Sequence, residues 1–129
     1  MDRTGRGAVL NAPGEPVTIE DVTLDPPGPD EVQVRIVASG VCHTDLHVKR
    51  TNGWGMAFPI LLGHEGAGYV EDAGENVHGV ALGDPVVIAW RAPCGSCRSC
   101  RRGRPWYCFD SANARQPMTL ADGTPLSPA

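Results

Sequence analysis

Apolar and polar positions alternate most regularly in residues 31–38. A valine or isoleucine stands at every second position there, at Val32, Val34 and Ile36, with polar side chains between them. This period of two is typical of a strand that has one buried face. We therefore predict a half-buried strand over this segment.

Four other apolar stretches, separated by turn residues, predict further strands. The first two cover residues 7–11 and 17–22 and flank a turn rich in proline and glycine. Residues 60–71 carry an apolar run into a glycine-rich strand, and residues 84–90 predict a strand buried on both faces. The tail from 110 to 129 contains several prolines, so we expect no closing strand or helix there. The predicted fold class is mainly β.

Two segments interrupt the strand pattern. Polar side chains crowd together from Cys42 to Asp45, and we expect a short helical turn at this point. Residues 51–59 have the composition of a surface loop. Trp54 and Phe58 should fold inward there, because two aromatic rings among glycines seldom stay solvated.

Length and charge narrow the classes of protein. A chain of 129 residues predicts one domain with one core. Its formal net charge of −4 argues against a nucleic-acid or anionic-membrane partner, since such surfaces recruit an excess of Lys and Arg. No apolar run reaches the roughly 18 residues of a membrane span, and residues 1–7 lack the apolar core of a signal peptide. We therefore expect a soluble, cytoplasmic protein with reduced thiols.

Four of the five cysteines lie close together in the sequence, at Cys94, Cys97, Cys100 and Cys108. Four thiolates at this spacing can surround one tetrahedral Zn²⁺, and a closed set of four sulfurs makes a structural site. The neighbouring arginines would offset the negative charge of a zinc tetrathiolate; they are Arg98, Arg101, Arg102 and Arg104. Disulfides or uncoordinated thiols are the alternatives.

Three further motifs occur in a fixed order: Gly40-Val-Cys-His-Thr-Asp45, Gly63-His-Glu-Gly-Ala-Gly68 and Gly83-Asp84. Together with the cysteine lobe, residues 91–109, they make nearly the whole chain resemble the zinc-containing medium-chain alcohol dehydrogenases. The segments 89–94, 102–110 and 118–124 look most like the branch of mycothiol-dependent formaldehyde dehydrogenase and nitrosomycothiol reductase.

The resemblance implies a GroES-like, partly open β-barrel with a zinc-binding lobe. In that family pattern, Cys42 and His64 look like ligands of a catalytic zinc, and the four clustered cysteines match the structural zinc. Glu65 would lie beside the catalytic metal. Asp45 would orient the His64 imidazole, as metal-bound histidines generally require. A catalytic zinc polarises a substrate oxygen and lowers the pKa of a bound alcohol.

The resemblance also implies roles for the neighbouring side chains. Thr44 and His47 look like the relay that carries the alcohol proton to solvent, and a histidine suits that transfer near neutral pH. His43 stands where the family often places a basic group near the dinucleotide pyrophosphate. Trp90 would line the substrate pocket.

Each of these residues has a plain structural explanation as well. Cys42 can be a small buried hydrophobe, and His64 a satisfied core or surface histidine. Thr44 and Asp45 are common at the start of a helix. His43 and His47, one helical turn apart, can form a solvated face. Trp90 can serve core packing alone.

Two features of the family are missing from these residues. No cysteine follows Cys108 to serve as a third catalytic ligand, and no Gly-x-Gly-x-x-Gly occurs. We therefore interpret residues 1–129 as the N-terminal part of a catalytic domain without its nucleotide-binding domain, so NAD would bind only in a full-length enzyme. The isolated chain should expose apolar surface and strand edges, and should need a C-terminal region or an oligomer partner.

The leading functional hypothesis is a zinc-binding segment of an NAD-dependent alcohol or formaldehyde (thiol-adduct) dehydrogenase, inactive or nearly so alone. Its substrate would be a small-molecule alcohol or thiol adduct. The alternative is a non-catalytic zinc-binding interaction protein. About two zinc ions per chain would favour the first, and a single zinc that vanishes with Cys97→Ser would favour the second.

Overall fold

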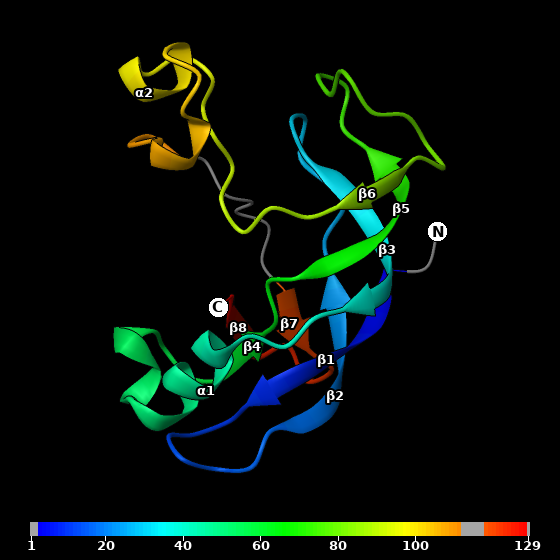
Figure 1. Cartoon of the computed structure of the whole chain (residues 1–129). Helices are drawn as coiled ribbons and strands as arrows, with labels where there is room; N and C mark the ends of the chain where they lie inside the picture. The colour runs from blue at the N-terminus through cyan, green and yellow to red at the C-terminus, as the bar shows by residue number, and fades with distance from the viewer. Residues whose placement is uncertain (1–2, 112–117, 129) are drawn as a thin grey trace.

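The computed structural model describes residues 3–111 and 118–128. Two sheets dominate the described part of the chain, and the mainly β class is confirmed (Figure 1). Five strands form a closed barrel in the order β1-β2-β7-β8-β4, and three form a separate sheet in the order β3-β5-β6. None of the helices in the described ranges has the length and apolar character needed to cross a bilayer.

The barrel strands are β1 (Thr4–Leu10), β2 (Thr18–Leu24), β4 (Ile60–Leu62), β7 (Met118–Leu120) and β8 (Pro125–Pro128). The three-stranded sheet consists of β3 (Val32–Ser39), β5 (Gly66–Ala73) and β6 (Pro85–Val87). The helical segments are α1 (His43–Arg50), α2 (Arg98–Arg101), and the 3₁₀ turns η1 (Asn52–Gly55) and η2 (Pro105–Tyr107). All strand pairs are antiparallel except β4 with β8, which is parallel.

The expectation that the tail adds no strand is wrong, because the hairpin of β7 and β8 closes the barrel. β7 pairs with β2, and β8 pairs with β4. Between the two strands, the carboxylate of Asp122 accepts a hydrogen bond from the backbone N–H of Thr124, and Gly123 takes the positive φ that the turn requires. Residues 112–117 of the tail lie outside the described residues.

Successive residues of β1 supply two separate apolar clusters, so the prediction of one core is also wrong. Val9 packs with Val22 and Leu126 inside the barrel. Leu10, on the opposite face of the strand, packs with Val48 of α1 and Ile60 of β4. Because neighbouring strand residues point to opposite sides, one strand fills the barrel and also anchors the helix on its outer surface.

The loop after α1 partly buries one of its two aromatic rings and exposes the other. Phe58 packs against the cluster around Ile60, as expected. Trp54 is 56% exposed, contrary to the prediction. Gly53 is buried, and a side chain added there would meet Ile60 and Phe58, so the inner position is already filled. Trp54 itself has a left-handed φ of 53°, and its ring contacts the ring of His47.

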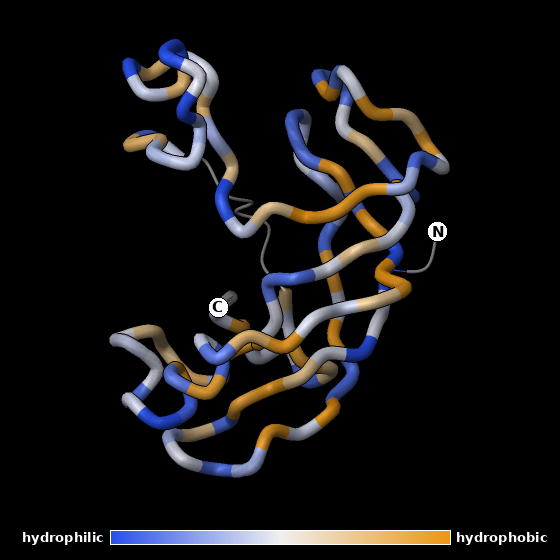
Figure 2. Tube along the Cα trace, viewed as in Figure 1, coloured by the Kyte–Doolittle hydropathy of each residue, from blue (hydrophilic) through white to orange (hydrophobic). Residues whose placement is uncertain are grey.

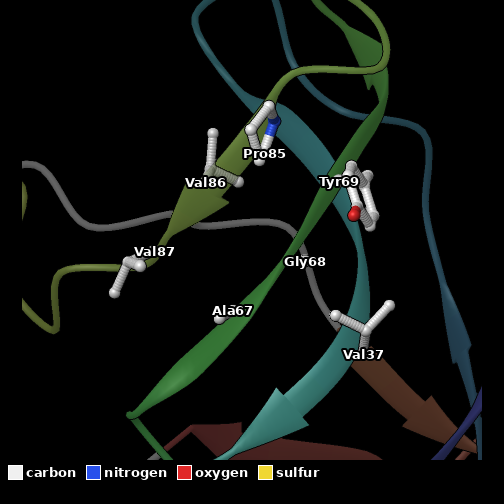
Figure 3. A pocket seen from close by; sticks show the side chains of 7 residues that line it. All are labelled: Val37, Ala67, Gly68, Tyr69, Pro85, Val86 and Val87. Atoms are coloured by element: carbon white, nitrogen blue, oxygen red, sulfur yellow. The ribbon is translucent and has the colours of Figure 1, made fainter.

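The three-stranded sheet leaves much of its apolar surface uncovered. Figure 2 shows the apolar residues that run along β6 of this sheet. Ile36 on β3 is exposed, and Val87 on β6 is 83% exposed. A shallow hollow on this sheet is lined by Val37, Ala67, Gly68, Tyr69, Pro85, Val86 and Val87 (Figure 3). The prediction that residues 31–38 form a half-buried strand and the prediction that residues 84–90 form a strand buried on both faces are therefore wrong. In the described residues, no second layer packs on this sheet. The expected exposure of apolar surface is confirmed.

Candidate metal centres

The four clustered cysteines converge on one point. Their sulfur atoms all lie within 4.8 Å of one another. A tetrahedral zinc with bonds of about 2.3 Å to sulfur places its ligands about 3.8 Å apart, so the set fits one zinc ion. All five cysteines of the chain are free thiols, which argues against the disulfide alternative. The lobe that carries the cluster stands away from the barrel (Figure 1).

Backbone amides aim at the sulfurs of this lobe. The N–H of Cys97 donates to Cys94 Sγ at 3.2 Å, and the N–H of Cys94 donates to Cys108 Sγ at 3.3 Å. Gly95 and Gly103 both have a φ of 76°, a left-handed conformation that turns the chain around the cluster. The cysteine spacing and the two glycines therefore work together to build a sulfur cage.

Hydrogen bonds to the sulfurs and burial of the thiols shift the pKa values of this cluster in opposite directions. A hydrogen bond from the Ser96 backbone lowers the pKa of Cys94 to about 6, and one from the Cys100 backbone lowers the pKa of Cys97. Burial raises the pKa of Cys100 to about 12. Zinc binds thiolates, so metal binding must displace the proton that Cys100 holds. The four nearby arginines are all exposed.

A second set of donor groups lies where two loops meet. The ligand atoms of Cys42, His64 and Glu65 lie within 4.8 Å of one another. Cys42 directly precedes α1, whereas the other two residues lie between β4 and β5. The backbone N–H of Gly40 donates to the Glu65 carbonyl oxygen at 3.0 Å and ties the two loops together. Sulfur, imidazole and carboxylate are the usual ligand types of a catalytic zinc, so this set also fits the metal.

Helix α1 is longer than the predicted turn, and its first residues hold this second site. Cys42 is the N-cap, and its sulfur accepts a hydrogen bond from the N–H of Thr44 at 3.4 Å. The carboxylate of Asp45 accepts the N–H of Cys42 at 3.1 Å, which completes a capping box. The helix ends at Arg50, and the hydroxyl of its C-cap residue Thr51 donates to the His47 carbonyl oxygen at 2.6 Å.

Asp45 and Thr44 combine capping with contacts to the donor set. The second oxygen of Asp45 lies 3.7 Å from His64 Nδ1, which leaves Nε2 as the nitrogen available to a metal. The Thr44 hydroxyl lies 3.4 Å from Cys42 Sγ. Hydrogen bonds from the Thr44 side chain and backbone, and then from His64, lower the pKa of Cys42. These contacts favour the thiolate that a metal ligand must be.

The remaining candidate residues lie outside the donor set. His43 and His47 are exposed on α1, and the ring of His47 also makes a T-shaped contact with the ring of Trp54. Trp90 is 66% exposed in a hollow that Pro93 and Trp106 help to line. The core-packing explanation for Trp90 is therefore wrong in this structure.

Sequence reasoning missed the contribution of Gly40. A methyl group on its Cα would overlap the Glu65 carboxyl group, so a larger residue at position 40 would displace that carboxyl group from its place beside Cys42. The available signal was its position two residues before Cys42, at the end of a strand.

We expect Gly40→Ala to weaken zinc binding at the second site by about tenfold or more, because the displaced Glu65 can no longer lie beside the metal. Titration of the zinc-loaded chain with a competing chelator measures this change. Gly5→Ala is the matched control, since the nearest atom to its added methyl group is 3.9 Å away on Val22. Unchanged zinc affinity in Gly40→Ala would contradict the assigned position of Glu65.

Comparisons with known proteins agree with this geometry. The family model described as "Alcohol dehydrogenase GroES-like domain" matches residues 28–124. An S-(hydroxymethyl)glutathione dehydrogenase of Aspergillus oryzae is 39% identical over 119 residues, which cover 92% of this chain and 31% of that protein. A geraniol dehydrogenase of Carpoglyphus lactis is 39% identical over 132 residues, which cover 95% of this chain and 35% of that protein.

A solved structure is similar as well. The crystal structure of an alcohol dehydrogenase zinc-binding domain protein from Burkholderia ambifaria superposes with a TM-score of 0.82 at 37% identity. The match covers 98% of this chain and 36% of that one. The chain thus spans about a third of the length of the curated relatives it matches.

Proposed function

Because the chain belongs to the alcohol dehydrogenase GroES-like domain family, we propose that it is the zinc-binding catalytic-domain segment of an NAD-dependent alcohol or thiol-adduct dehydrogenase. The observation that carries this proposal is the meeting of Cys42, His64 and Glu65 beside the start of α1, apart from the four-cysteine cluster. One donor set is closed by four sulfurs. The other brings one thiol, one imidazole and a neighbouring carboxylate together, and it has no second cysteine in the described residues, so it leaves coordination positions open, as a catalytic zinc site does.

Zinc in the open site would supply a Lewis acid that polarises the oxygen of an alcohol. Cys42 and His64 would hold the metal, and Asp45 would keep the His64 ring in the orientation that presents Nε2. The hydroxyl of Thr44, 3.4 Å from the Cys42 sulfur, is placed to accept the alcohol proton. His47, one helical turn further along and exposed, passes that proton to water. His43 offers a basic group to the dinucleotide phosphates, and Trp90 contributes to the substrate pocket.

The proposed substrate is a small alcohol or the adduct of formaldehyde with a low-molecular-weight thiol. The similarity to an S-(hydroxymethyl)glutathione dehydrogenase supports the thiol adduct, and the resemblance to the mycothiol-dependent branch suggests mycothiol as the thiol. The nucleotide-binding domain for NAD would come from residues beyond this chain. We place the protein in the cytoplasm, where thiols stay reduced.

Residues 1–129 then form the N-terminal part of the catalytic domain, with the structural zinc lobe at residues 91–109. The uncovered sheet of β3, β5 and β6 supports the view that this segment is inactive alone. Large apolar side chains on it are exposed, and in a longer protein they would be covered by further chain or by an oligomer partner.

The same sheet also supports the alternative of a non-catalytic zinc-binding interaction protein, because an exposed apolar face can bind another protein. Under that alternative the four-cysteine cluster stabilises the fold, and the Cys42 site performs no chemistry.

The reading frame downstream of residue 129 separates these functions. We expect it to continue into a nucleotide-binding domain, and the longer polypeptide to reduce NAD with a formaldehyde–thiol adduct. Thr44→Val should then lower kcat by about 10²-fold or more, the usual contribution of a proton-transfer group. A reading frame that stops at this point would contradict the proposed dehydrogenase function. A longer protein whose turnover is unaffected by Thr44→Val would contradict the proposed proton relay.

A further inference from the structure

The outer face of α1 gathers three aromatic rings at its end of the molecule. The ring centroids of His43 and His47 lie 5.4 Å apart, with their planes inclined at 56°. The ring of Trp54, from η1, makes a T-shaped contact with His47, with the ring centroids 6.0 Å apart. All three side chains are exposed. In Figure 1, η1 directly follows α1 at the lower end of the structure.

The separation of the two imidazoles suits a shared metal ion. A metal held by one nitrogen of each ring at about 2.0–2.1 Å lies about 3.2 Å from each ring centre, so a tetrahedral angle places the centres about 5.2 Å apart. The observed 5.4 Å is close to this value. The spacing of four residues keeps both rings on one side of the helix, where rotation of the two side chains can turn a nitrogen of each ring toward a shared ion.

The surroundings define which metal this pair would take. In the described residues, no third His, Cys, Asp or Glu ligand atom joins the two imidazoles, so water would complete the coordination. Imidazole suits Cu²⁺, Ni²⁺ and Zn²⁺ and is a poor ligand for Mg²⁺ or Ca²⁺. Because both rings are exposed, an ion can bind without the cost of burying its charge.

We propose that His43 and His47 form a surface binding site for a divalent transition-metal ion, in addition to the two cysteine-containing sets. The Irving–Williams order predicts tighter binding of Cu²⁺ than of Ni²⁺ or Zn²⁺. Where the proposed dehydrogenase function holds, an ion bound here would withdraw His47 from proton transfer and make the longer enzyme sensitive to excess metal. The metal site itself does not require that function.

Ni²⁺ chelated by iminodiacetate is the probe that tests this site. The chelator occupies three coordination positions of the Ni²⁺ ion. The remaining positions can accept two imidazoles, but they are too few for the four sulfurs of the cysteine lobe. The zinc-loaded chain is titrated with the probe while tryptophan fluorescence is followed, and it is also passed over a column that carries the same chelate. We expect binding of one Ni²⁺ per chain, quenching of Trp54 and retention on the column.

Substitutions identify the ligands. His43→Gln and His47→Gln should each weaken binding by about tenfold or more, because the second imidazole no longer binds intramolecularly. His78→Gln is the matched control, since His78 is an exposed histidine in the turn-rich segment between β5 and β6 and should leave binding unchanged. Trp54→Phe should remove most of the quenching and keep the column retention. Circular dichroism of each variant verifies that the fold is retained.

Three outcomes would overturn the proposal. The first is equal binding by the wild-type chain and His43→Gln. The second is an equal loss of binding in His78→Gln. The third is release of zinc during the titration, which would mean that Ni²⁺ had entered the cysteine sites.

Discussion

Replacing Cys97 with serine is expected to remove one zinc ion per chain and to open the cysteine lobe to protease. Within residues 91–109 only Cys108 is buried, so the lobe has almost no apolar core of its own. Its order must come from the metal and from the amides that point at the sulfurs. Structural zinc contributes on the order of 10 kcal/mol to the folding of small zinc domains, and serine is a far weaker ligand than thiolate.

Trypsin provides the measurement, because the lobe carries exposed arginines at Arg98, Arg101 and Arg102. Cleavage there should be about two orders of magnitude faster in Cys97→Ser than in the wild-type chain, since local opening no longer costs several kcal/mol. Cys42→Ser is the matched control, because it also removes one thiol but lies outside the lobe. Equal trypsin resistance of Cys97→Ser and the wild type would show that the lobe does not depend on metal.

The second large effect is expected for Leu10→Ala. Leu10 is completely buried between the barrel and α1, where it packs with Val48 and Ile60. Truncation of a buried leucine to alanine costs about 2–5 kcal/mol through lost burial and the cavity left behind. Small domains have about 5–15 kcal/mol of stability in total, and an uncovered sheet puts this chain at the low end.

We therefore expect Leu10→Ala to lose most of its cooperative unfolding transition in a urea titration. It should also weaken zinc binding at Cys42, because that residue caps the helix which Leu10 supports. Leu82→Ala is the control, since Leu82 is 67% exposed and should change stability by only about 0.5 kcal/mol. A transition midpoint in Leu10→Ala equal to that of the control would contradict the role of this cluster.

Local patterns were sufficient to predict several strands and the cysteine cage. Alternation over residues 31–38 located β3, and the close spacing of Cys94, Cys97 and Cys100 brought their sulfurs together. The hairpin of β7 and β8 could not be predicted in this way, because its strands pair with β2 and β4, far away in the sequence. Proline within the tail also argued against a strand, although barrel strands tolerate it where no ladder N–H is needed.

Burial was the least predictable property of the fold. The apolar pattern of β3 and β6 is that of buried strands, yet both are largely exposed. A sequence pattern records what a strand packs against in the whole protein. It does not tell whether that packing layer lies within these residues, and in the described part of the chain it does not.

The second metal site was beyond any purely local pattern. Cys42 and His64 lie on different loops, so only the family resemblance could associate them. The capping role of Cys42 sulfur, the contact between Gly40 and Glu65, and the ring of Trp54 against His47 all depend on how the loops approach each other. No spacing rule in the sequence specifies that approach.

The central claim is that this chain holds two zinc ions in two separate donor sets. Elemental analysis of the reduced, purified protein, combined with zinc X-ray absorption, tests it most directly. We predict about two zinc ions per chain, with four sulfur ligands around one and a mixture of sulfur, nitrogen and oxygen around the other. Cys97→Ser and Cys42→Ser should each remove one. A chain without zinc, or with one zinc that is unaffected by Cys42→Ser and absent from Cys97→Ser, would contradict the claim.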